Sequence, residues 1–106
     1  MYTIGILGEV RAFASSATPE NWLPCDGRLV GISKYSALFS VIGIAFGGDG
    51  RSTFGIPDLR GKIPVHPTQY ELGGQAGLSG ASAFDYQDVL AFNVCVCFDG
   101  TFPSRQ

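Results

Sequence analysis

One stretch of the sequence limits the fold more than any other, residues 46–66, FGGDGRSTFGIPDLRGKIPVH. Gly47, Gly48 and Gly50 can take positive φ without a Cβ clash, whereas each proline, such as Pro57, fixes φ and removes an amide donor. Neither a helix nor a long strand is compatible with this spacing. The sequence therefore predicts a long, ordered loop.

Single large apolar side chains between these glycines and prolines are expected to pin the loop onto a core. Buried irregular backbone needs hydrogen-bond partners, and the aspartates and arginines of the loop can supply them. We therefore expect at least one Asp/Arg pair in this stretch. The expected anchors are Phe46, Phe54, Ile56, Leu59, Ile63 and Val65, and the expected polar partners are Asp49, Arg51, Asp58 and Arg60.

Four segments carry a resemblance that covers most of the chain. They are GEVRAF (8–13), NWLPCDGRL (21–29), YSALFSVIG (35–43) and GGDGRSTFGIPDLRGKIPVH (47–66), and VLAFNVCVCFDGTFPSR (89–105) closes the chain. Together they resemble the phage tail-collar domain family, found in phage short tail fibres and in small bacterial microcystin-dependent proteins. The PDLRG segment beside CDG makes the resemblance specific.

The resemblance implies a structural assembly protein of a phage tail, tail fibre or related contractile particle. By analogy with tail fibres, it implies a homo-oligomer, a trimer, that also contacts other tail or baseplate proteins. The expected location is the virion tail or an assembled extracellular particle, after synthesis in the bacterial cytoplasm. The residues expected to shape the assembly loops are Asp26, Gly27, Gly47, Gly48, Asp49, Arg51, Pro57, Asp58 and Arg60.

One departure from the family concerns metal binding. Longer members carry, after an LGG turn, an insert with a His-x-His segment, and such motifs bind metal in related trimeric fibres. Here LGGQAGLSG (72–80) runs directly into ASAFDYQDVLAF, and His66 is the only histidine of the chain. We therefore expect no metal and no cofactor, and a flexible segment over 67–83 where the insert is missing.

Apolar patterning predicts short strands and one helix. Residues 2–14 indicate one or two strands bent at glycine, with the charged side chains of the later strand facing away from Val10. A hairpin is expected around the Cys25-Asp26-Gly27 turn. The pattern over 84–98 indicates a long central strand, buried on both faces.

The single predicted helix spans about 34–42. Ser33 is the expected N-cap and Gly43 the expected stop, and the apolar stripe between them should dock on the strands. The predicted fold class is α+β, mostly β: one small glycine-rich collar-type domain over residues 1–106, with the helix packed on short strands beside the long loop. Phe102 and Pro103 are expected to form a last anchor.

Composition and charge exclude several function classes. The net charge is −2 and the seven basic residues are scattered singly, so nucleic acid is not an expected partner. No apolar run approaches the roughly 20 residues of a membrane span, and the start of the chain has no signal-peptide pattern. Only 15% of residues are charged and 45% are hydrophobic, which favours a surface partly covered by other subunits.

No motif in the sequence indicates catalysis, so an enzyme is not expected. Cys25, Cys95 and Cys97 are an odd number without metal-ligand spacing and are interpreted as small buried hydrophobes. The alternative to a structural function is a carbohydrate or cell-surface receptor-binding module at a tail tip. Its possible ring-stacking residues are Trp22, Tyr35, Tyr70 and Tyr86, although Trp22 is first interpreted as a core residue.

Overall fold

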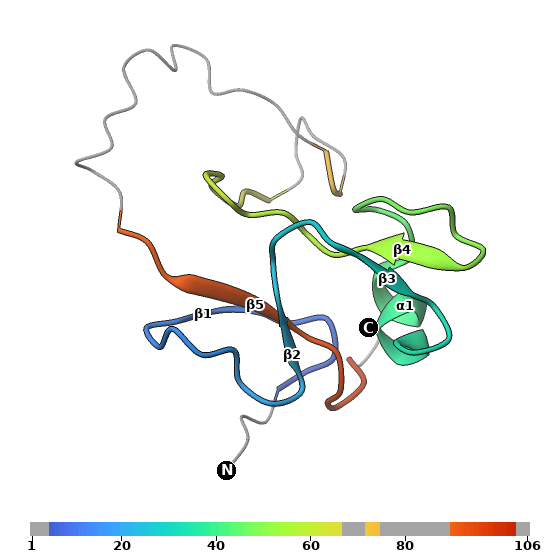
Figure 1. Ribbon diagram of the computed structural model, residues 1–106, viewed down its shortest axis with the longest axis horizontal. Coiled ribbons are helices and arrows are strands. Elements are labelled where there is room, and N and C mark those ends of the chain that lie inside the picture. The colour runs from blue at the N-terminus through green and yellow to red at the C-terminus, as the bar shows by residue number, and fades with distance from the viewer. Residues whose placement is uncertain (1–4, 67–71, 75–89, 104–106) are drawn as a thin grey trace.

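The computed structural model describes residues 5–66, 72–74 and 90–103, which form two small antiparallel sheets and one helix (Figure 1). The elements are β1 (Val10–Phe13), β2 (Trp22–Pro24), β3 (Leu29–Gly31), α1 (Ser36–Ile42), β4 (Thr53–Gly55) and β5 (Asn93–Cys97). One sheet has the strand order β1-β5-β2, and β3 pairs with β4 in the other. The predicted α+β, mostly β class is confirmed. The expected flexible segment 67–83 lies outside the described residues, apart from 72–74.

Strand β5 is the centre of the larger sheet, as the apolar run near the end of the chain predicted. It pairs with β1 on one side and β2 on the other, and Cys95, Val96 and Cys97 are at most 1% exposed. The strand is shorter than expected, because β1 ends at Phe13, the partner of Asn93. The preceding Leu90 and Phe92 are exposed.

Two apolar clusters form the core, one on each face of β5, because successive strand residues point to opposite faces. Val96 points into the larger cluster, and Cys95 and Cys97 into the smaller one. The larger cluster consists of Leu7, Leu23, Cys25, Leu38, Phe54, Ile56 and Val96, and the smaller one of Trp22, Cys95 and Cys97 with Phe13 beside them. The three cysteines are buried free thiols, as interpreted from the sequence.

Helix α1 contributes to the larger cluster through Leu38, which is fully buried. The helix begins at Ser36, two residues later than expected, and the predicted N-cap Ser33 is wrong. The amide of Tyr35 instead donates to the carbonyl of Gly31, so a turn precedes the helix, and no side chain caps it. The predicted stop is confirmed, because Gly43 has φ of 58° and its amide donates to the carbonyl of Phe39.

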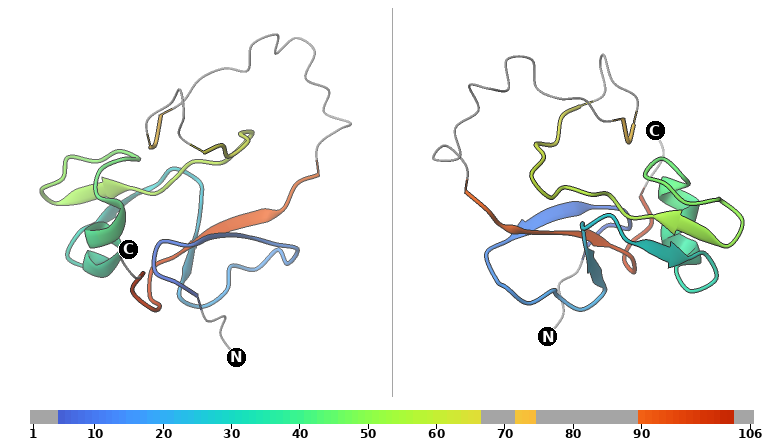
Figure 2. Two further views of the ribbon diagram at one scale, coloured as in Figure 1. Left: turned by 180° about the vertical axis from the view of Figure 1, so that it is seen from behind. Right: turned by 45° about the horizontal axis from the view of Figure 1, so that its top comes forward.

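The hairpin expected around residues 25–27 is wrong. Strand β2 pairs with β5 and β3 pairs with β4, so the turn between them joins two different sheets. Figure 2 shows the β3–β4 pair to one side of the larger sheet, near α1. The turn therefore positions the β3–β4 pair relative to the larger sheet.

Several expected anchors are exposed. Phe54 and Ile56 are buried and Leu59 packs against the larger cluster, but Ile63 and Val65 are more than half exposed. Ile63 and Val65 follow Gly61 and lie beyond the part of the loop that contacts the core. Phe102 is also exposed, although the adjacent Thr101 forms a bridge with Ile6.

Strand β1 is half-buried, but it does not follow the usual pattern of apolar side chains inside and charged side chains outside. Val10 is 45% exposed, whereas Arg11 and Phe13 lie against Trp22. The guanidinium carbon of Arg11 is 5.0 Å from the centroid of the tryptophan ring. The guanidinium of Arg11 therefore forms a cation–π contact with Trp22 on the smaller cluster's side of the sheet.

Candidate functional site: two paired Asp-Arg turns

The first turn of the candidate site is built by Asp26, Gly27 and Arg28. The amide and Nε of Arg28 donate to Oδ1 of Asp26 at 3.2 and 3.0 Å, and Nη2 donates to Oδ2 at 2.8 Å. Gly27 has φ of 78°, a conformation that favours glycine. One carboxylate thus fixes both the turn and the guanidinium in a two-point contact.

The second turn repeats this geometry at Asp58, Leu59 and Arg60. The amide and Nε of Arg60 donate to Oδ1 of Asp58 at 3.2 and 2.9 Å, and Nη2 donates to Oδ2 at 3.0 Å. Lys62 adds a second cation, with Nζ 3.7 Å from Oδ2 of Asp58. The Asp/Arg pair expected in the long loop is confirmed.

The two turns meet although 32 positions in the numbering separate their aspartates. Asp26 and Asp58 are partners in an antiparallel bridge, and the amide of Leu59 donates to the carbonyl of Cys25 at 3.0 Å. A Cβ on Gly27 would lie 2.9 Å from the Cβ of Asp58, so the close approach requires glycine. We call residues 26–28 and 58–60 the paired turns.

Electrostatics keep the paired turns ionised. The hydrogen bond from the Arg28 side chain is the main cause that lowers the pKa of Asp26 below its ordinary 3.8. The corresponding bond from Arg60 holds the pKa of Asp58 well below its usual range, and Asp58 in turn raises the pKa of Arg60. Both carboxylates are therefore ionised near neutral pH and are held in charge-assisted bonds, an arrangement that suits loop structure and surface recognition.

A third turn, centred on Asp49, shapes the preceding part of the loop. Oδ1 of Asp49 accepts from the amides of Arg51, Ser52 and Thr53 at 2.8, 2.9 and 3.0 Å. These three bonds hold the pKa of the carboxyl well below its usual range, with the bond from Thr53 the largest cause. Gly48 has φ of 91°, and a Cβ there would overlap the Cα of Phe54.

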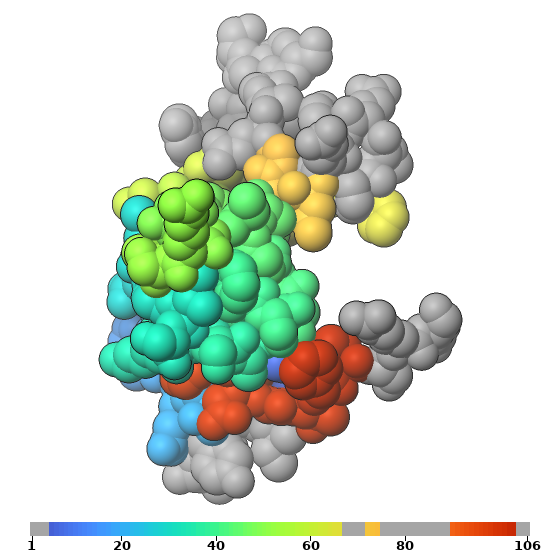
Figure 3. All heavy atoms as spheres, turned by 90° about the vertical axis from the view of Figure 1, so that its right-hand side faces the viewer, coloured from blue at the N-terminus to red at the C-terminus, as the bar shows by residue number. Residues whose placement is uncertain are grey.

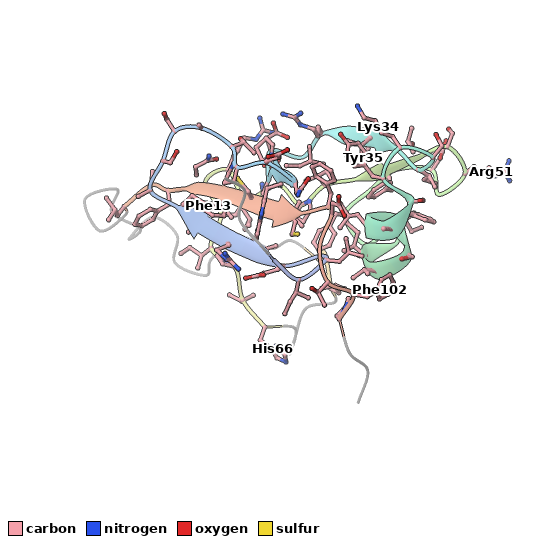
Figure 4. The ribbon with its side chains drawn as sticks, turned by 90° about the horizontal axis from the view of Figure 1, so that it is seen from below. Phe13, Lys34, Tyr35, Arg51, His66 and Phe102 are labelled. Carbon is pink, nitrogen blue, oxygen red and sulfur yellow. The ribbon has the colours of Figure 1, made fainter. Side chains whose placement is uncertain are left out.

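The remaining loop residues of the expected set have defined positions. Gly47 has φ of 122° and its carbonyl accepts from the amide of Gly55 at 2.9 Å, while Pro57 is buried. Arg51 contributes its backbone amide, but its side chain projects into solvent and forms no ion pair with a described residue (Figure 4). The loop lies at the surface beside the α1 residues (Figure 3).

The alternative hypothesis, a carbohydrate-binding module, named four aromatic residues for ring stacking. Among the described residues, these side chains do not form a common surface. Trp22 is 3% exposed and meets Phe13 edge to face, which confirms its interpretation as a core residue. Tyr35 is half-buried and meets Phe98 edge to face, with Nζ of Lys34 5.5 Å from its ring centroid (Figure 4). Trp22 and Tyr35 belong to different clusters. Tyr70 and Tyr86 lie outside the described residues.

Within residues 5–66, 72–74 and 90–103, no group of three or more histidine, cysteine, aspartate or glutamate side chains is placed to hold a metal ion. His66 is exposed and points away from the ribbon (Figure 4). Sequence reasoning did not assign a role to Glu9 and Arg11, which form an ion pair of 2.7 Å on the larger sheet. Glu9 lies just before β1 and Arg11 within it, and the alternating pattern had already predicted that both charged side chains face away from Val10.

A family model described as Phage Tail Collar Domain matches residues 8–64, more than half of the chain. The matched range begins just before β1 and contains the Asp49 turn and both paired turns. The chain therefore belongs to the phage tail collar domain family, a family of structural domains of phage tails. This confirms the resemblance seen in the sequence. The comparison with curated proteins found no match.

Proposed function

We propose that this protein is a structural subunit of a phage tail, tail fibre or related contractile particle, and that it assembles with copies of itself. The family match across residues 8–64 carries the proposal. By analogy with tail fibres, the assembly unit is a trimer. Other tail or baseplate proteins are its further partners.

The surface chemistry supports an assembly function. Ten large apolar side chains are exposed among the described residues, and only 15% of the residues of the chain are charged. Contacts between subunits would bury such side chains, which favour an interface over open solvent. The same part of the chain has no helix with the length and apolar character needed to cross a bilayer.

The paired turns are the proposed assembly contact of the matched region. Arg60 has a side chain that is 71% exposed, yet its guanidinium is fixed by two bonds to Asp58. A fixed guanidinium loses little conformational entropy when a partner binds it, and arginine is enriched at interface hot spots. The turn can therefore contact a partner subunit without a conformational change.

The test is the molar mass of Arg60→Ala compared with Arg51→Ala, measured by light scattering after size exclusion. Arg51 is the matched control, because it is exposed on the same loop and shares no ion pair with a described residue. Arg60→Ala should release smaller species at a concentration where the wild type and Arg51→Ala stay assembled. Equal masses for all three proteins would remove the paired turns from the interface.

The tail location is tested separately by electron microscopy. Antibodies against this chain should label the tails of particles from the cells that produce it. Label that is absent from assembled particles, with the protein remaining in the unassembled fraction, would contradict a structural role in the tail.

A further inference from the structure

The outer edge of strand β1 carries backbone groups that no residue in the described part of the chain pairs. The amide of Cys97 donates to the carbonyl of Glu9, the residue before β1, at 2.9 Å, so the register directs the bonds of Arg11 and Phe13 to β5. Residues of an antiparallel strand alternate in direction, and Val10 and Ala12 therefore direct their amides and carbonyls away from the sheet. Both residues are exposed, and neither has a bond outside the β1–β5 ladder.

The other outer strand of the same sheet, β2, is closed by its own chain. The amide of Trp22 donates to the carbonyl of Pro19 at 3.2 Å. Pro24 has no amide hydrogen, and its carbonyl accepts from the amide of Asp26 at 3.0 Å. Strand β2 thus offers no continuous row of free donors and acceptors.

The smaller sheet is closed in a similar way. On β4, the amide of Gly55 donates to Gly47 and the carbonyl of Thr53 accepts from Gly50. On β3, the carbonyl of Gly31 accepts from Tyr35, which leaves Leu29 as the one fully free residue of that edge. Among the described strands, β1 therefore has the edge best suited to accept a further strand (Figure 2).

The charges of β1 are complementary to a second copy of the same strand. In a two-fold antiparallel pair with Val10 opposite Val10 of the second copy, Glu9 of each copy stands opposite Arg11 of the other. Opposite charges at such positions stabilise a strand pair, whereas the register with Arg11 opposite Arg11 places like charges together. A register centred on Ala12 would leave Glu9 without a cross-strand partner.

The side chains at this edge fit that register. Val10 is 45% exposed and would meet Val10 of the second copy, and the pairing ends before Gly8, whose amide donates to the carbonyl of Cys97. Glu9 and Arg11 already form an ion pair with 29% and 38% exposed side chains, so the second copy would extend the pair to a network of four charges. The register therefore places an apolar pair on one face and the charged pairs on the other.

We propose that two copies of this protein associate through their β1 strands, related by a two-fold axis at Val10, to form one continuous six-stranded sheet. This inference rests on the proposed self-assembly and names one surface for it. The edge pairing joins two single chains, or two larger units such as trimers, so the assembly contains an even number of copies. Between two single chains, an isologous contact of this kind closes on itself and does not propagate.

The test exchanges charges between copies and measures mass by sedimentation velocity. Glu9→Arg alone and Arg11→Glu alone each place like charges opposite each other, so each variant should show half the wild-type mass and at least about tenfold weaker association. An equimolar mixture of the two variants pairs every positive charge with a negative one and should recover the wild-type mass. Glu20→Arg and Arg51→Glu, at exposed sites away from β1, are the matched controls and should change nothing.

Ala12→Pro provides a second test that alters no charge. The substitution removes an amide that points away from the sheet and leaves the bonds to β5 in place. Proline is tolerated at such a position of an edge strand. It should weaken the association, whereas Leu29→Pro on the outer edge of β3 should not. A wild type with an odd number of copies, or a charge-variant mixture that stays dissociated, would overturn the edge pairing and leave the proposed function intact. A monomeric wild type would overturn both.

Discussion

At the scale of single residues, glycines set the path of the loop through close contacts. Gly48 combines φ of 91° with a position where a Cβ would overlap the backbone of Phe54, whereas Gly61 has φ of 64° and open space around it. Gly61→Ala should therefore cost about 1–2 kcal/mol of unfolding free energy from backbone strain alone. Gly48→Ala should cost more, because the β4 backbone must also move.

Urea unfolding of these two alanine variants measures the difference directly. The wild type and both variants should show cooperative transitions, with the midpoint of Gly48→Ala clearly below that of Gly61→Ala. Equal midpoints would show that strain from positive φ accounts for both, and that the packing of Gly48 against Phe54 contributes nothing.

Burial should make the three thiols unreactive in the folded protein. All three cysteines are at most 5% exposed, and desolvation raises the pKa of Cys25 to about 12. Burial also raises the pKa of Cys95 and Cys97. Since the thiolate is the reactive form, a disulfide reagent such as DTNB at about pH 8 should react only after unfolding. Rapid reaction of one thiol equivalent in native buffer would contradict the burial of that cysteine.

At the scale of elements, α1 packs on the larger cluster mainly through Leu38, with Phe39, Val41 and Ile42 beside it. Leu38 is fully buried in the larger cluster, and a helix of this length is not stable alone. Leu38→Ala should cost about 2–5 kcal/mol, because it leaves a cavity in the core. Ser36→Ala, at an exposed site on the same helix, should change the unfolding free energy by less than about 0.5 kcal/mol. Thermal unfolding of both variants checks this, and a loss for Leu38→Ala no larger than that for Ser36→Ala would contradict the role of Leu38 in the core.

The elements that the sequence predicted well are those in which an apolar pattern and the tertiary contacts agree. Consecutive apolar residues around Val96 indicated a strand buried on both faces, and β5 is the central strand. Ser33 was a plausible cap by residue type, but a turn held by the carbonyl of Gly31 delays the helix. Local propensity could not reveal that contact.

The candidate site was predictable in part. The aspartates and arginines of the loop indicated at least one Asp/Arg pair, because they can supply bonds to irregular backbone, and Asp58 and Arg60 form such a pair. The bridge between Asp26 and Asp58 was not predictable, since nothing in one turn specifies its partner elsewhere in the chain. The hairpin expected at the first turn failed for the same reason.

At the scale of the whole molecule, acid should destabilise the fold. The pKa of Glu9 is lowered from 4.5, mainly by the bond from the amide of Ile6, and those of Asp26, Asp49 and Asp58 are lowered from 3.8. A lowered pKa in the folded state contributes stability that is complete above the unfolded value and is lost as pH falls through the folded value. Tm should therefore change little from about pH 7 to 5 and fall steadily below about pH 4.

Asp49→Asn is the variant that tests whether a carboxylate with a lowered pKa contributes to acid unfolding. It removes one carboxylate whose oxygen accepts three amides in the folded state, so its Tm should be lower at neutral pH and should depend less on pH in acid. A pH dependence identical to that of the wild type would show that Asp49 does not contribute to acid unfolding.

The central claim, that this collar-family chain is an assembling structural subunit, is tested most directly by the molar mass of the purified wild type in solution. Light scattering should give an integer multiple, greater than one, of the 11.2 kDa chain, which persists on dilution to about micromolar concentration. A single species of 11.2 kDa at that concentration would contradict the claim.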